Sequence, residues 1–92
     1  MCPDVASALP AVPAGAQADV SRELRYLDTI LADANRRLRA AQSIPDPNFV
    51  QNAILGPLIN QRIASLDRIT IAIDRFAPRP SGLERLARCA VR

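Results

Sequence analysis

The fold is decided by residues 19–41, which read DVSRELRYLDTILADANRRLRAA. Apolar side chains recur in this stretch at alternating spacings of four and three, at Val20, Leu24, Leu27, Leu31, Ala34, Leu38 and Ala41. That alternation keeps one stripe of an α-helix turned toward a partner helix over several turns. Asp19 near the start and the arginines near the end of the stretch complement the helix dipole. We therefore predict a long helix with a single apolar seam.

A proline-rich turn follows this helix. Pro45 and Pro47 cannot continue an α-helix, and each one restricts the residue before it. Asp46 is suited to cap a second helix whose first position is Pro47. Apolar residues at helical spacing then continue as far as Phe76, so we predict a second helix that runs antiparallel to the first.

The second helix contains two segments that depart from a regular helical pattern. Gly56 and Pro57 remove a backbone hydrogen bond, which predicts a kink or a short break between residues 53 and 57. Residues 69–73 (ITIAI) also alternate like a β-strand. Because no second strand-like run is available to pair with them, helix is the better interpretation.

These elements predict an all-α fold, an antiparallel, coiled-coil-like helical hairpin over residues 18–77. Residues 1–17 are rich in proline and small side chains, which predicts a disordered Pro/Ala-rich arm. Residues 78–92 are expected to form a linker and a short C-terminal helix that ends near Val91. Ser81 and Glu84 match a capping box at the start of that helix.

The apolar sector of the second helix is wider than one partner helix can cover. A chain of 92 residues also buries only about 60–65% of the surface that its unfolded form exposes, so we expect oligomerisation or a partner protein to complete the fold. The residues predicted to bind that partner are Tyr26, Ile30, Leu58, Arg62, Ile71 and Phe76. Arg62 lies within the apolar sector, and we expect its stem to cover the seam while its guanidinium reaches the edge or Asp28.

Nothing in the sequence predicts an enzyme. Histidine is absent, the two cysteines lack zinc-ligand spacing, and the chain has neither a glycine-rich phosphate loop nor a nucleophile elbow. We predict no catalytic residues, no metal ligands and no cofactor. The leading hypothesis is a non-enzymatic protein–protein interaction module.

The charge pattern supports one alternative function. The net charge of +3 is small, and acidic residues accompany the arginines along both helices, so nucleic-acid binding is not favoured. Arg68 and Arg75 nevertheless lie seven residues apart on one exposed strip. The alternative is a small helical regulator that binds nucleic acid or an anionic nucleotide through these two arginines.

Cys2 and Cys89 stand near opposite ends of the chain. A disulfide between them is compatible with the sequence, yet two free thiols in a reducing compartment are the expected state. No apolar run is long enough to cross a membrane, and residues 1–17 lack the features of a cleaved signal. We therefore expect a cytoplasmic protein. Every basic residue is arginine, which is typical of GC-rich coding sequences and favours a bacterial source.

The hairpin pattern resembles the small helical-hairpin co-chaperones of type III secretion needle subunits. The resemblance rests on residues 46–52 (DPNFVQN), on Leu58 and Ile59, and on residues 69–76 (ITIAIDRF), and it covers residues 20–76. It implies that the hairpin binds a helical-repeat chaperone. The pair would then hold an aggregation-prone needle subunit as a soluble monomer in the bacterial cytoplasm.

Overall fold

The computed structural model describes residues 2–46 and 48–90, and all the regular structure in them is helical. The predicted all-α fold is confirmed. The elements in chain order are α1 (Val5–Ala8), the 3₁₀-helix η1 (Ala14–Ala16), α2 (Gln17–Ala40), the 3₁₀-helix η2 (Ala41–Ser43), the π-helix η3 (Gln51–Leu55), α3 (Gly56–Asp74) and the 3₁₀-helix η4 (Leu83–Ala87).

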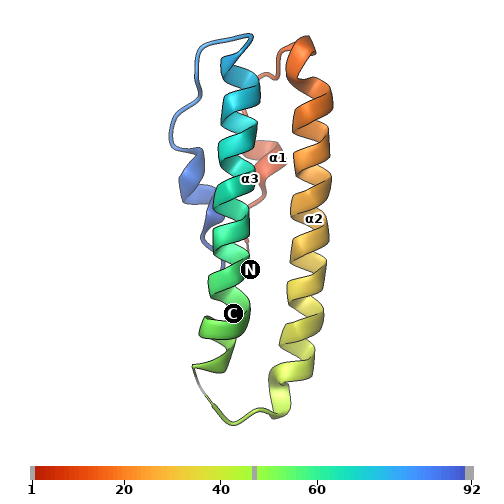
Figure 1. Ribbon diagram of the computed structural model, residues 1–92, viewed down its shortest axis with the longest axis vertical. Helices are drawn as coiled ribbons and strands as arrows, with labels where there is room; N and C mark the ends of the chain where they lie inside the picture. Colours follow the sequence, from red (N-terminus) through yellow and green to blue (C-terminus); the bar gives the residue numbers. More distant parts are fainter. Residues whose placement is uncertain (1, 47, 91–92) are drawn as a thin grey trace.

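The two long helices α2 and α3 lie antiparallel, side by side, and form the predicted hairpin (Figure 1). The molecule is elongated, with extents of 48 × 20 × 18 Å. Val20 and Leu27 from the seam of α2 are buried with Leu66 and Ile69 of α3, and Ala34 is buried in a second cluster with Ile54, Leu55 and Leu58, so the seam prediction is confirmed. Spacings of four and three place these side chains on one face, which is why they meet the partner helix together.

The turn between the helices follows the predicted chemistry at Asp46. Its carboxylate oxygen Oδ1 accepts a hydrogen bond of 2.9 Å from the backbone N–H of Asn48. The expected role of Pro47 as first helical residue lies outside the described residues. An Asp side chain that accepts from the N–H two residues later is a common way to start a helix.

The second helix is irregular near Gly56 and Pro57, as predicted, and the irregularity is a π-helical turn without a break. The Gly56 backbone N–H donates to the Gln51 carbonyl, five residues back. Pro57 then occupies the first turn of α3, where its missing N–H has little consequence. A Cβ on Gly56 would lie 3.1 Å from the Gln51 oxygen, so glycine suits this tight approach.

The prediction of a disordered N-terminal arm is wrong for the residues that the structure describes. Val5 and Ala16 are buried, and Leu9 and Val12 pack against the same core. Figure 1 shows this segment behind the two long helices. The few aliphatic side chains of the arm supply a third side of the core, which a hairpin alone leaves open.

The C-terminal segment packs on the same molecule, along α3 on the side away from α2 (Figure 1). Its helix is the short 3₁₀ turn η4, and its predicted end near Val91 lies outside the described residues. Ser81 does not cap it, because Gly82, with φ of +78°, occupies the cap position and no side chain makes a capping hydrogen bond. Leu83 and Ala87 of η4 are buried.

Within the described residues, no helix combines the length and apolar character needed to cross a membrane.

Candidate functional site

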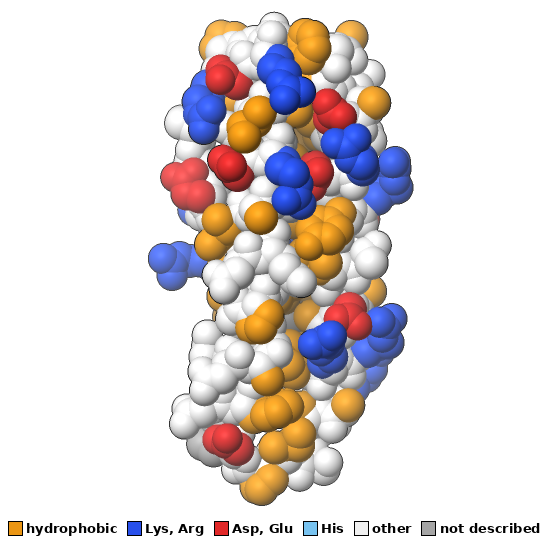
Figure 2. Space-filling view, viewed as in Figure 1, with side chains coloured by type: hydrophobic (Ala, Val, Ile, Leu, Met, Phe, Trp, Pro, Cys, Tyr) orange, Lys and Arg blue, Asp and Glu red, His pale blue; other side chains and the backbone are white. Residues whose placement is uncertain are grey.

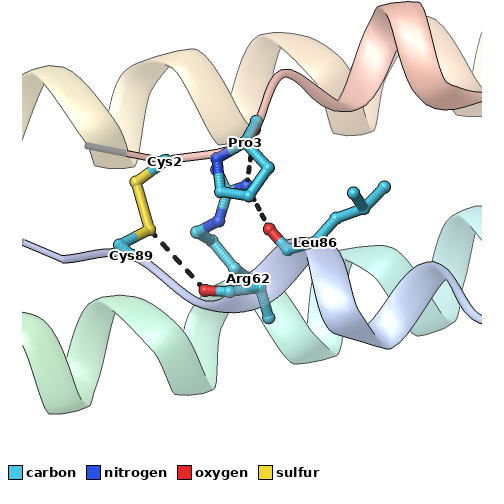
Figure 3. Close-up of a disulfide and its surroundings, with 6 residues drawn as sticks. Cys2, Pro3, Arg62, Leu86 and Cys89 are labelled. Atoms are coloured by element: carbon cyan, nitrogen blue, oxygen red, sulfur yellow. Dashed lines mark hydrogen bonds between the residues drawn. A yellow bond between two sulfur atoms is a disulfide. The ribbon is translucent and has the colours of Figure 1, made fainter.

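The two cysteines form a disulfide, with their Cα atoms 4.3 Å apart (Figure 3). The expectation of two free thiols is therefore wrong. The cysteines are separated by 87 residues in sequence, and they meet because both terminal segments run back along the hairpin. Their even number was the only sequence signal for the bond, and sequence alone could not show that the two ends converge.

Arg62 is buried beside the disulfide, between the two terminal segments (Figure 3). Its Nη2 donates to the carbonyl oxygen of Pro3 at 3.0 Å and to that of Leu86 at 2.6 Å. The expected contact with Asp28 is not formed. The guanidinium binds two backbone carbonyls instead of Asp28, one from each terminal segment. The sequence prediction places the guanidinium at a solvent-exposed edge, and the terminal segments cover that edge.

The environment of Arg62 is unusual for a charged side chain. Only 2% of the residue is exposed, and its Nε is buried without a hydrogen-bond partner. Among the described residues no carboxylate lies within ion-pair distance of it. Loss of hydration on burial lowers the pKa of the guanidinium from its ordinary value.

A second polar cluster joins α2 to α3 through Glu23, whose side chain is buried. Its Oε1 accepts from the Ser65 hydroxyl at 2.9 Å and from Arg68 Nε at 3.0 Å. The Arg68 guanidinium also lies over the ring of Tyr26, 5.5 Å from the ring centre. Arg68 and Tyr26, predicted to bind an anion and a partner respectively, thus contribute to the contact between the helices.

An open groove of about 530 Å³ runs between α3 and the segment that leads to η4. Ile63 on one wall is 46% exposed, which is high for an isoleucine. Asp67 of α3 and Glu84 of η4 also line the groove, and neither has an ion-pair partner among the described residues. Arg79, the cation in the same groove, pairs with Asp74 at 3.6 Å.

The other predicted partner-binding residues do not form one surface. Leu58 is buried in the cluster that also holds Ala34 and Ile54, and Ile30 is half-buried against this cluster. Ile71 and Phe76 are exposed, and the Phe76 ring lies where a Cβ on Gly15 would be. Arg75, the second arginine of the alternative, is exposed. The sequence prediction missed the groove because its second wall comes from the C-terminal segment, whose path no local pattern shows.

Figure 2 shows one face of the hairpin. Charged side chains of both signs gather in its upper half and at the right edge of its lower half, and a strip of hydrophobic side chains runs down the middle of the lower half. Among the described residues there is no group of three or more His, Cys, Asp or Glu side chains that could hold a metal ion.

No protein-family model, curated protein or solved structure matches the chain.

Proposed function

We propose that the chain is a non-enzymatic protein–protein interaction module whose docking surface is the groove along α3. The observation that supports this proposal is the exposed side chain of Ile63 in a groove of about 530 Å³. Ile63, Asp67 and Ile71 follow one another at spacings of four residues, so they lie on one strip of α3. Ile71 is also exposed and extends this strip two turns beyond Ile63. Exposed apolar side chains in a groove rimmed by polar ones are typical of helix-binding surfaces.

The charges of the groove define the partner. Asp67 and Glu84 stand on opposite walls and have no basic partner within residues 2–46 and 48–90, whereas the cation Arg79 pairs with Asp74. A helix that presents aliphatic residues to Ile63 and arginine or lysine to the two carboxylates would satisfy both features. The partner we propose is therefore a basic amphipathic helix of another protein.

The expected gain in binding energy is modest for each residue. Complete burial of an isoleucine side chain is worth about 1.5–3 kcal/mol, so covering the exposed half of Ile63 contributes about 1 kcal/mol. Comparable amounts from neighbouring side chains give a docking site of weak to moderate affinity.

The disulfide bears on the location of the protein. Disulfides persist in oxidising compartments and are rare where glutathione keeps thiols reduced. The Cys2–Cys89 bond therefore supports a role outside the reducing cytoplasm, in place of the expected cytoplasmic location. A type III secretion co-chaperone acting in the bacterial cytoplasm would be a special case of helix docking, and no contact described above favours it over other helix-binding roles.

The alternative role as an anion-binding regulator is less well supported. It requires Arg68 and Arg75 to be available together, and Arg68 is held by Glu23 and Tyr26. Steep weakening of nucleic-acid binding with added salt, together with its loss on replacing Arg75 by glutamine, would restore that alternative.

Fluorescence anisotropy with two labelled synthetic helical peptides tests the docking proposal. One peptide carries leucines and arginines on opposite edges of one face, and the other replaces each arginine with glutamate. We expect the arginine peptide to bind at least about tenfold more tightly. The double variant Asp67→Asn/Glu84→Gln should remove this preference, whereas Asp33→Asn, at an ion pair on α2, should preserve it.

Two results would contradict the proposal. One is no binding of the arginine peptide, and the other is binding that the double variant leaves unchanged. Light scattering supplies a further test. A dimer that dissociates on Asp67→Asn/Glu84→Gln would show that a second copy of this chain, rather than another protein, occupies the groove.

A further inference from the structure

The buried guanidinium of Arg62 has no counter-charge in the described part of the chain. Its two hydrogen bonds, both from Nη2, go to neutral backbone carbonyls. A guanidinium has five N–H donors, so the donors on Nε and Nη1 are left over, and Nε is buried. Buried charges in proteins are normally paired with an opposite charge, and none of the described carboxylates pairs with this one.

A cavity of about 300 Å³ lies next to Arg62, between the N-terminal segment and α2. Arg62 lines it together with the aliphatic side chains of Val5, Leu24, Leu27 and Leu31. Its volume is at the lower end of the range for small-molecule sites. The cavity thus combines one unsatisfied buried cation with apolar walls.

Two carboxylates complete the lining, those of Asp4 and Asp28. Both residues are exposed, and neither has an ion-pair partner in the segments that the structure describes. The cavity therefore presents positive charge at a buried position and negative charge at exposed positions.

We propose that this cavity binds a small apolar zwitterion, of which a free aliphatic α-amino acid is the simplest example. The ligand carboxylate would accept from Nη1 of Arg62, because Nε is covered by the surrounding chain. Its ammonium group would pair with Asp28 or Asp4, and its aliphatic side chain would contact the leucines of α2. A simple fatty acid fits less well because the two carboxylates repel it, and a simple amine leaves Arg62 without a counter-charge.

This site shares no lining residue with the groove along α3. The proposal is therefore independent of the docking function, and the two can fail separately.

The test is a titration of the oxidised, isotope-labelled full chain followed by NMR chemical shifts. Three probes of similar size are compared: L-leucine, 4-methylpentanoate with the carboxylate alone, and isopentylamine with the amine alone. We expect saturable shifts with L-leucine at residues around Leu24, Asp28 and Leu31. The two singly charged probes should bind at least about tenfold more weakly.

The variant Asp28→Asn separates ligand binding from a structural role, because Asp28 is exposed and can be replaced without opening the core. It should weaken L-leucine binding about tenfold and leave 4-methylpentanoate binding equal or stronger. Asp33→Asn, also on α2 but outside this cavity, should not affect either probe.

Three results would overturn the proposal. The first is the absence of shifts with L-leucine at concentrations where the chain stays folded. The second is equal binding of L-leucine and 4-methylpentanoate. The third is a marked fall in melting temperature for Asp28→Asn with unchanged L-leucine binding, which would make Asp28 the structural partner of Arg62.

Discussion

Reduction of the Cys2–Cys89 bond should destabilise the protein strongly, because the bond joins the two ends of nearly the whole chain. For a sequence separation of 87 residues, the loop-closure entropy lost from the unfolded state corresponds to about 4.6 kcal/mol. A domain of 92 residues has a total stability of about 5–14 kcal/mol. The disulfide thus contributes a third or more of the stability.

The effect is measured by urea unfolding followed by circular dichroism at 222 nm, on the oxidised chain, on the chain in dithiothreitol and on the double variant Cys2→Ser/Cys89→Ser. The reduced chain and the double variant should behave alike, and dithiothreitol should not affect the variant. A loss of less than about 1 kcal/mol would refute this account, because the terminal segments would then hold their places without the bond. A count of two free thiols in the unfolded, non-reduced chain would refute it outright.

Two substitutions test the packing in other places. Glu23→Gln should lower the free energy of unfolding by about 1–3 kcal/mol, because Ser65 and Arg68 lose a buried charged acceptor. Asp33→Asn, which removes exposed ion pairs, should cost less than about 1 kcal/mol, and equal losses would contradict the assignment. Gly82→Ala should cost about 1–2 kcal/mol because φ at this position is +78°, and an unchanged urea midpoint would show that the turn is not required.

Local periodicity predicted the hairpin well. The seam from Val20 to Ala41 and the apolar positions of α3 repeat at helical spacing, so each helix and its buried face are encoded within the segment itself. The position of the irregularity at Gly56 was also predictable, since proline removes a known hydrogen bond.

The terminal segments were not predictable in the same way. Residues 2–16 have no period, and their order depends on contacts with residues more than 50 positions away, including the bond between Cys2 and Cys89 and the contact between Pro3 and Arg62. The composition of this segment is typical of disorder, and tertiary contacts override that tendency.

The candidate sites depend on the same long-range contacts. The position of Arg62 on the apolar face marks it as unusual in the sequence. Its hydrogen bonds to Pro3 and Leu86 could not be predicted, because they depend on the paths that both ends of the chain take in the fold. The burial of Glu23 had only a weak signal, its place beside Leu24 in the seam. The groove likewise requires the segment before η4 as its second wall.

The most direct test of the docking claim compares two isoleucines of similar exposure. Ile63 in the groove is 46% exposed, and Ile44 in the turn between the long helices is 41% exposed. Binding of the arginine-rich synthetic helix should weaken about fivefold for Ile63→Ser, the equivalent of about 1 kcal/mol, and stay within about twofold of the parent for Ile44→Ser, with both variants fully folded. Equal binding by the two variants, or a larger loss for Ile44→Ser, would contradict the claim that the groove along α3 is the docking surface.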